Sequence, residues 1–170
     1  MKGLFERPPA LVSPRLGLLR KDQFQISYVT NNIDLACGTF RKRYGVSEFS
    51  FLGGPMPSGG EIKVAFSWVG LTLYEIIAAR GPGTEFYNEL LPRDEFAIRF
   101  HHLGFLIHDR NFWQALKREF DESSWPIAYT SLNDGFMDAY YVKAPELGHY
   151  LEYIFPYQAG VDFFSSVPVS

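Results

Sequence analysis

The feature that most constrains the fold is an internal repeat with an offset of 77 residues. Three pairs of polar residues share this offset: Gln25 and His102, Glu75 and Glu152, and Asn32 and Asp109. The order is the same in each half. Gln25 or His102 lies near the start of a strand pattern, Asn32 or Asp109 can cap the helix that follows, and Glu75 or Glu152 comes 50 positions after the first of these residues. Three coincidences at one offset indicate that the chain folds as two copies of one unit.

Each half is expected to form a strand, a helix and three further strands, because the periodicity of its apolar residues changes in that order. In the first half the expected elements are strand 24–30, a helix capped by Asn32 and ended by Gly45, and strands 47–52, 62–68 and 71–78. In the second half they are strand 101–107, helix 109–120, and strands 127–131, 136–142 and 150–155. The glycines between residues 53 and 60 predict a flexible loop able to cover a pocket.

The length and the repeat together predict one α+β body built from two tandem βαβββ modules. The expected segments are an N-terminal extension at 1–22, a first module at 23–80, a linker at 81–98, a second module at 99–156 and a C-terminal tail at 157–170. The sheets of the two modules are expected to bury their faces against each other. Pseudo-symmetry would then bring equivalent inward-facing residues together near the axis that relates the modules.

The composition excludes several classes of protein. The net charge is −3 and the only basic cluster is Arg41–Arg43, so neither nucleic acid nor a membrane surface is an expected partner. No apolar run is long enough to cross a bilayer, and the first residues lack a signal-peptide pattern. The single cysteine, Cys37, excludes an internal disulfide, so we expect a cytoplasmic protein. Aromatic residues make up 17% of the chain, which fits a Phe-rich core or an apolar pocket.

The carboxylates Glu75 and Glu152 each lie within an apolar strand pattern. A strand carboxylate can point outward to solvent, whereas an inward one needs a cation to offset the cost of burial. Because the repeat groups both with Gln25 and His102, it favours the inward arrangement. One imidazole, two carboxylates and an amide oxygen suit an octahedral divalent ion, and Zn, Ni, Co, Mn and Fe all remain candidates. His101 is expected to face away from the ligand side, at the surface or behind His102.

Three features of the sequence resemble the vicinal oxygen chelate superfamily. They are the duplicated βαβββ pattern, these four positions, and the run Gly148-His149-Tyr150-Leu151-Glu152. This superfamily includes glyoxalase I, methylmalonyl-CoA epimerase, extradiol dioxygenases and antibiotic-resistance proteins, and the resemblance covers about residues 24 to 155. It implies a curved mixed sheet around a central cavity that holds one divalent metal ion, and a homodimer. The four residues Gln25, Glu75, His102 and Glu152 match the metal ligands of one type of glyoxalase I, whereas the sequence around His102 is closer to epimerase-like and glyoxalase-like members.

The resemblance implies a metal-dependent lyase or an isomerase of the epimerase type. Such an enzyme removes a proton next to the carbonyl of a ketone or thioester, and the metal stabilises the enolate. Glu152 is the expected base, and Glu75 is its counterpart on the opposite face. Two other functions stay open. One is a metal-free protein that sequesters an aromatic or apolar ligand. The other is an iron-dependent dioxygenase, although this chain has Gln25 where the ligand pattern of those enzymes has its first histidine.

Overall fold

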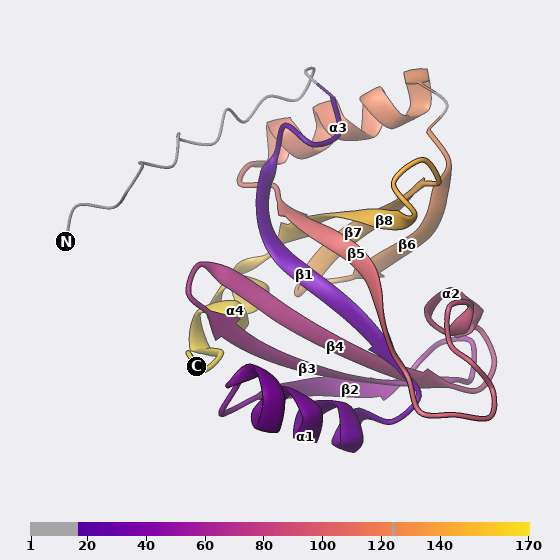
Figure 1. Ribbon diagram of the computed structural model, residues 1–170. Helices are drawn as coiled ribbons and strands as arrows, with labels where there is room; N and C mark the ends of the chain where they lie inside the picture. Colours follow the sequence, from indigo (N-terminus) through magenta and orange to yellow (C-terminus); the bar gives the residue numbers. More distant parts are fainter. Residues whose placement is uncertain (1–16, 124) are drawn as a thin grey trace.

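The fold was analysed in a computed structural model that describes residues 17–123 and 125–170, so residues 1–16 of the expected N-terminal extension lie outside the described part. The predicted α+β fold with two βαβββ units is confirmed (Figure 1). The first unit contains β1 (Asp22–Thr30), α1 (Ile33–Tyr44), β2 (Ser50–Pro55), β3 (Glu61–Val69) and β4 (Thr72–Arg80). The second contains β5 (Ile98–Leu106), α3 (Arg110–Ser123), β6 (Ile127–Asn133), β7 (Met137–Ala144) and β8 (His149–Pro156).

The two units form one curved eight-stranded sheet in the order β2-β3-β4-β1-β5-β8-β7-β6. They meet edge to edge through antiparallel pairing of β1 with β5, so the expectation that their sheets pack face to face is wrong. Within each unit the first strand pairs in parallel with the fourth, β1 with β4 and β5 with β8. The other edge of β1 and of β5 would be unpaired in a single unit, and the two strands fill these edges by hydrogen-bonding to each other. The repeat holds in the register as well. Gln25 lies opposite Leu73, and their counterparts His102 and Tyr150, each 77 positions later, also lie opposite each other.

Local sequence explains where the two long helices begin. The side chain of Asn32 accepts a hydrogen bond from the backbone N–H of Leu35 at 3.0 Å, and Asp109 accepts one from Phe112 at 2.7 Å. Both caps therefore use the same offset of three residues, as the predicted repeat requires. Gly45 ends α1 with φ of 74°, a left-handed conformation that glycine adopts without strain.

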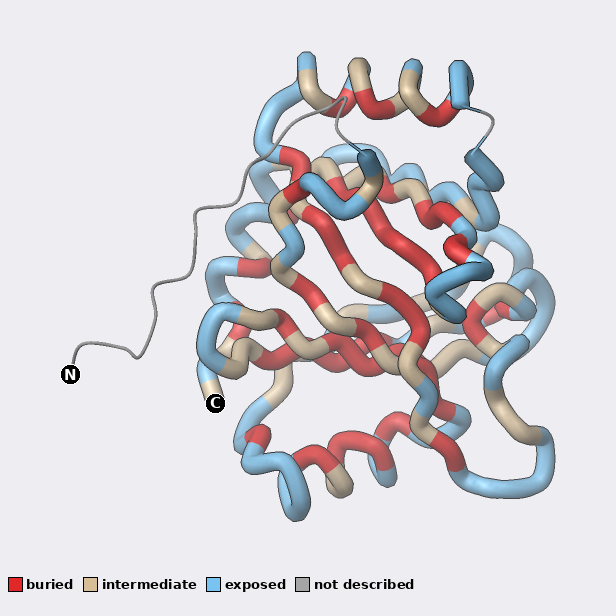
Figure 2. The backbone as a smooth tube through the Cα atoms, turned by 45° about the horizontal axis from the view of Figure 1, so that its top comes forward, coloured by how far each residue is buried: buried red, intermediate tan, exposed pale blue. Residues whose placement is uncertain are grey.

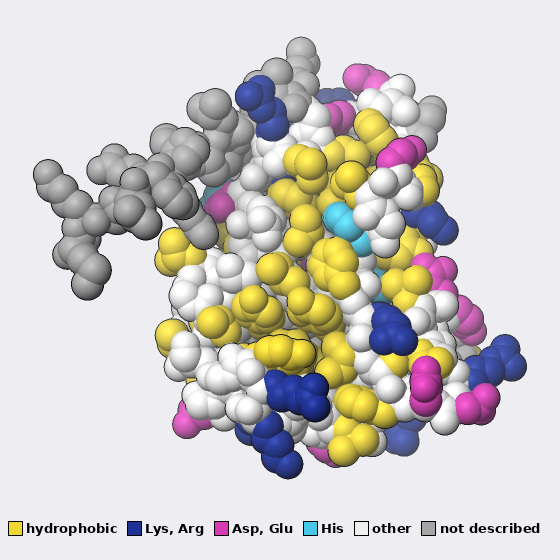
Figure 3. Space-filling view, in the orientation of Figure 1, with side chains coloured by type: hydrophobic (Ala, Val, Ile, Leu, Met, Phe, Trp, Pro, Cys, Tyr) yellow, Lys and Arg dark blue, Asp and Glu magenta, His cyan; other side chains and the backbone are white. Residues whose placement is uncertain are grey.

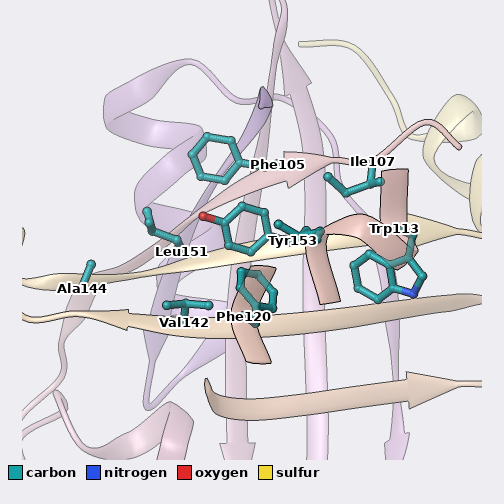
Figure 4. Close-up of a cluster of buried hydrophobic side chains, with 9 residues drawn as sticks. Phe105, Ile107, Trp113, Phe120, Val142, Ala144, Leu151 and Tyr153 are labelled. Carbon is teal, nitrogen blue, oxygen red and sulfur yellow. The ribbon is translucent and has the colours of Figure 1, made fainter. Parts of the chain in front are cut away.

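The outer face of the sheet is covered by α1 over the first unit and α3 over the second (Figure 1). Buried residues lie along each of the central strands β4, β1, β5 and β8 (Figure 2). Under α3, Trp113, Leu116 and Phe120 pack against Phe105 and Tyr153 in a dry cluster (Figure 4). Alternate residues of β8 therefore point toward α3, and the residues between them point to the inner face of the sheet.

Two shorter helices lie against the inner face. In the linker, α2 (Glu85–Asn88) buries Tyr87, and after β8 the chain forms α4 (Gln158–Ser166), which buries Phe164. The tail then returns to the first unit, because the N–H of Trp68 donates to Pro168 O at 2.9 Å and that of Ser170 donates to Trp68 O at 2.8 Å. The C-terminal tail thus ties the second unit to β3.

The glycine-rich stretch differs from its predicted form. Gly53 and Gly54 belong to β2, where they pair with Lys63 and Ile62, and so they form no flexible cover. Their φ values of 156° and 154° are accessible mainly to glycine, and a Cβ on Gly53 would lie 2.3 Å from Ile62 O. Among the described residues, no helix is long and apolar enough to cross a membrane.

Candidate metal centre

The four predicted positions converge on the inner face of the four central strands. Gln25, Glu75, His102 and Glu152 come from β1, β4, β5 and β8, and none is more than 6% exposed. Gln25 Nε2 lies 2.8 Å from Glu75 Oε2 and 3.3 Å from Glu152 Oε2. His102 Nε2 lies 3.2 Å from Glu75 Oε2 and 3.0 Å from Glu152 Oε2. Both carboxylates therefore point inward, and the alternative of two solvent-facing carboxylates is wrong.

Two small residues leave room for this cluster, and sequence reasoning missed both. Ser27 lies opposite Glu75 on one side and His102 on the other, and Gly104, 77 positions later, lies opposite Gln25 and Glu152. A Cβ on Gly104 would lie 2.7 Å from the Cβ of Gln25, which is too close for two carbon atoms. The signal that could have found them is their position two residues after each first-strand ligand, on the same face of the strand.

A pair of β-bulges explains the placement of His101. The pairing of β1 with β5 shifts register between Ser27 and Tyr28, which leaves His101 as the extra residue of β5. A bulge turns two successive side chains toward one face. His101 is therefore fully buried beside His102, with 2.8 Å between the two Nδ1 atoms. The prediction that simple strand alternation turns His101 away from the ligand side is wrong.

The buried charges raise the proton affinity of His102. Burial lowers the pKa of this imidazole, but the carboxylates of Glu152 and Glu75 outweigh that effect and raise it to about 9. Burial, and then the neighbouring imidazole, lower the pKa of His101 to about 3, so that side chain is neutral. The pKa of Tyr141 is raised well above its usual value by burial and by Glu152, to which the phenol is hydrogen-bonded. Without a metal, His102 is therefore an imidazolium beside the side chains of Glu75 and Glu152.

The residues fit a divalent metal ion. Metal–ligand distances of about 2.1 Å place neighbouring ligand atoms of an octahedron about 3.0 Å apart. The ligand atoms of Glu75, His102 and Glu152 all lie within 4.8 Å of one another, and both His102–carboxylate separations are close to that spacing. The Oε1 atom of Gln25 is buried without a hydrogen-bond partner. A half-turn of this amide exchanges Oε1 with Nε2 and places the oxygen ligand inside the cluster.

The remaining histidines lie outside the cluster. His108 Nε2 lies 2.6 Å from Asp22 Oδ2 at the surface, and the ring of His149 lies 4.9 Å from that of Phe100. Among the four converging residues, the imidazole of His102 is therefore the only one.

An apolar cavity lies beside β1, β3 and the C-terminal tail, and none of the four converging residues lines it. It has a volume of about 580 Å³ and borders Phe24, the chain neighbour of Gln25. Its wall contains aromatic and aliphatic side chains from β1, β3 and the C-terminal tail, among them Trp68, Phe164 and Val167. The cavity is large enough for an organic ligand of moderate size.

Comparison with known proteins defines the fold. No family model matches the sequence, and no curated protein matches it. Solved structures do match: a methylmalonyl-CoA epimerase in complex with methylmalonyl-CoA and NH4+ has 13% identity and a TM-score of 0.56, covering 82% of this chain and 96% of that chain. At this identity the likeness shows the fold alone, and the matched fold agrees with the predicted α+β architecture.

Two further solved structures show the same likeness. A hypothetical protein from Bacillus halodurans C-125 has 13% identity and a TM-score of 0.58, with 81% of this chain and 96% of that chain covered. Methylmalonyl-CoA epimerase from Mycobacterium tuberculosis has 11% identity and a TM-score of 0.53, with 84% and 94% covered.

Proposed function

We propose that the protein is a metal-dependent isomerase of the epimerase type that removes a proton next to the carbonyl of a small thioester or ketone. The observation that carries this proposal is the buried convergence of Gln25, Glu75, His102 and Glu152. The choice of an epimerase over a lyase, and of a thioester over a ketone, is supported by the structural neighbours, one of which holds methylmalonyl-CoA.

The four residues would bind one divalent ion, either Zn, Ni, Co, Mn or Fe. The cluster buries two acidic side chains beside one imidazole, and among the described residues neither acidic side chain pairs with Lys or Arg to balance its negative charge. A bound divalent ion would offset this charge and supply positive charge where a carbonyl oxygen becomes negative.

The chain itself supplies the proton transfer. Glu152 accepts the proton from the carbon next to the carbonyl, so the C–H bond breaks and its electron pair enters the carbonyl system. Tyr141 orients this carboxylate through its hydrogen bond. Glu75 reaches the cluster from β4, the strand equivalent to β8. It enters the reaction as the carboxylic acid and gives its own proton to the opposite face of the carbon, while Glu152 keeps the proton that it removed. Burial keeps water from the carboxylates during the transfer.

Exchange of the substrate proton with deuterated water tests this proposal. Metal-loaded protein is incubated with methylmalonyl-CoA and a panel of other acyl-CoA thioesters and ketones, and deuterium uptake is followed by mass spectrometry. Glu152→Gln should abolish uptake while one equivalent of Co²⁺ still binds, whereas Glu146→Gln, an exposed control, should not change either property. Undiminished exchange in the Glu152→Gln variant would remove Glu152 as the base.

The cavity beside Phe24 favours a second candidate, a metal-free protein that sequesters an apolar or aromatic ligand. Protein purified without chelator separates the two functions, because the binder contains no stoichiometric metal and takes none up. The iron dioxygenase is the weakest alternative, since the cluster contains a single imidazole, and it predicts oxygen consumption with catechols.

A homodimer is also proposed, from the superfamily resemblance, and a cytoplasmic location is proposed from the single cysteine. Hydrophobic side chains form a band across the middle of the face seen in Figure 3, over the region of β1, β4 and β5 in Figure 1. A pocket of about 380 Å³ is lined by Tyr28, Tyr74 and Ile98 together with side chains of α1. Sedimentation equilibrium of the full chain measures the oligomeric state.

A further inference from the structure

We infer that His101 is a positioning residue that selects the tautomer of His102 and so presents the Nε2 lone pair of His102 to the metal. This inference rests on the proposed function, because it concerns how the metal ligand is held. It assigns a role to a residue that simple strand alternation would place outside the site.

The direction of each hydrogen bond follows from the partners. His101 Nε2 lies 3.1 Å from the carbonyl oxygen of Phe86, which can only accept, so this nitrogen carries the proton. A neutral imidazole with a proton on Nε2 has a lone pair on Nδ1. This Nδ1 atom of His101 lies 2.8 Å from Nδ1 of His102, which must therefore donate the hydrogen bond. His102 then keeps the proton on Nδ1, so that when the imidazolium loses its other proton to bind metal, the lone pair is on Nε2, the atom that faces Glu75 and Glu152.

This relay of hydrogen bonds, from the Phe86 carbonyl through His101 to His102, begins on a backbone group. Phe86 belongs to α2, and its ring stacks on that of Tyr129 with 5.0 Å between centroids and 15° between planes. The ring of His101 contacts Phe86 edge to face at 4.8 Å, and that of Tyr150 at 5.0 Å. Since His101 is completely buried among these rings, water cannot replace the Phe86 carbonyl as its partner.

The other module supplies an internal comparison. The residue equivalent to His101 is Phe24, 77 positions earlier, and it is likewise the extra residue of a bulge, on β1. Phe24 precedes Gln25, whose amide has no tautomer to select. The bulged neighbour is thus apolar beside the amide ligand and polar beside the imidazole ligand. A hydrogen-bonding neighbour is therefore present beside the ligand that has two tautomers, and absent beside the ligand that has none to select.

Two substitutions test the inference. His101→Phe copies the first module and removes the acceptor, which leaves the buried Nδ1–H of His102 without a partner and favours the tautomer with a proton on Nε2. Loss of an outer hydrogen-bond partner typically weakens metal binding about 10- to 100-fold. His101→Asn keeps an acceptor oxygen near the position of Nδ1 and should bind Co²⁺ within a few-fold of wild type. Affinity is measured by Co²⁺ titration of the full chain.

Nitrogen NMR of the wild-type chain gives a readout that does not depend on a variant folding. In the Zn²⁺-loaded protein, His102 should carry its proton on Nδ1 and bind through Nε2, and His101 should carry its proton on Nε2 with or without metal. A proton on Nδ1 of His101, or equal Co²⁺ affinity in His101→Phe and wild type, would overturn the inference. If the wild type takes up no metal, the proposed function fails and the His101 tautomer still tests the relay. If metal binds as predicted but no proton exchange occurs, only the reaction is wrong.

Discussion

The proton on His102 makes metal binding depend on pH in a way that can be calculated. Its pKa is raised to about 9, so at neutral pH the metal-free imidazole is a cation held by Glu75 and Glu152. A metal ion can use Nε2 only after that cation has lost a proton. Below pH 9, each bound ion therefore displaces one proton, and the affinity should rise about tenfold for each pH unit. Between pH 6.5 and 8.5, the dissociation constant should fall about 100-fold, equivalent to about 2.7 kcal/mol.

The stability of the metal-free protein should change in the opposite direction. Because the folded pKa of about 9 exceeds the ordinary value of 6.5, stabilisation is complete below pH 6.5 and is lost as pH rises to 9. The loss is about 3 kcal/mol. Co²⁺ titrations and urea unfolding at pH 6.5, 7.5 and 8.5 measure both trends. His108→Gln is the control, because His108 lies in an exposed pair with Asp22 and should leave both slopes unchanged. An affinity that does not vary with pH would refute the assignment of His102 as a protonated ligand.

Three further changes test the packing around the centre. Gly104→Ala places a Cβ 2.7 Å from that of Gln25, so it should cost about 1–3 kcal/mol and weaken Co²⁺ binding. Ser27→Ala at the equivalent position should be tolerated because it removes a buried hydroxyl without a partner, and equal melting temperatures for the two variants would contradict this account. Leu116→Ala should destabilise the protein to urea by about 2–5 kcal/mol without changing Co²⁺ affinity, since Leu116 is fully buried beneath α3, away from the centre. Tyr141→Phe should slow proton exchange while Co²⁺ still binds, because it removes the phenol that orients Glu152 and changes none of the four proposed ligands. An unchanged exchange rate would contradict that role of Tyr141.

The sequence was sufficient to predict the two-module fold and the four converging residues. Strand alternation and helix caps are set by neighbouring residues, and duplication makes each half a check on the other. Asn32 and Asp109 could thus be identified as caps, and Gln25 and Glu75 could be matched with His102 and Glu152. The convergence of the four then follows from the symmetry of the sheet rather than from any single motif.

Features that depend on pairing between distant strands could not be predicted. The bulge at His101 exists only because β1 and β5 pair in a particular register, and the space that requires Gly104 exists only once Gln25 lies opposite it. Helix α4 gave no local signal, because Tyr157 before it makes no side-chain cap hydrogen bond and because Gly160, a poor helix former, lies within it. Its position is set by contacts with the first unit, such as the hydrogen bond from Trp68 Nε1 to Phe164 O at 3.0 Å.

The metal content of the protein tests the central claim most directly. Full-length protein purified without chelator, and again after incubation with Zn²⁺ or Co²⁺ and removal of free ions, is measured by elemental mass spectrometry. The wild type should contain one divalent ion per chain, and the double variant Glu75→Gln and Glu152→Gln should contain none while keeping the same circular dichroism spectrum. No uptake by the wild type, or one ion per chain in the double variant, would contradict the assignment of this cluster as a metal centre.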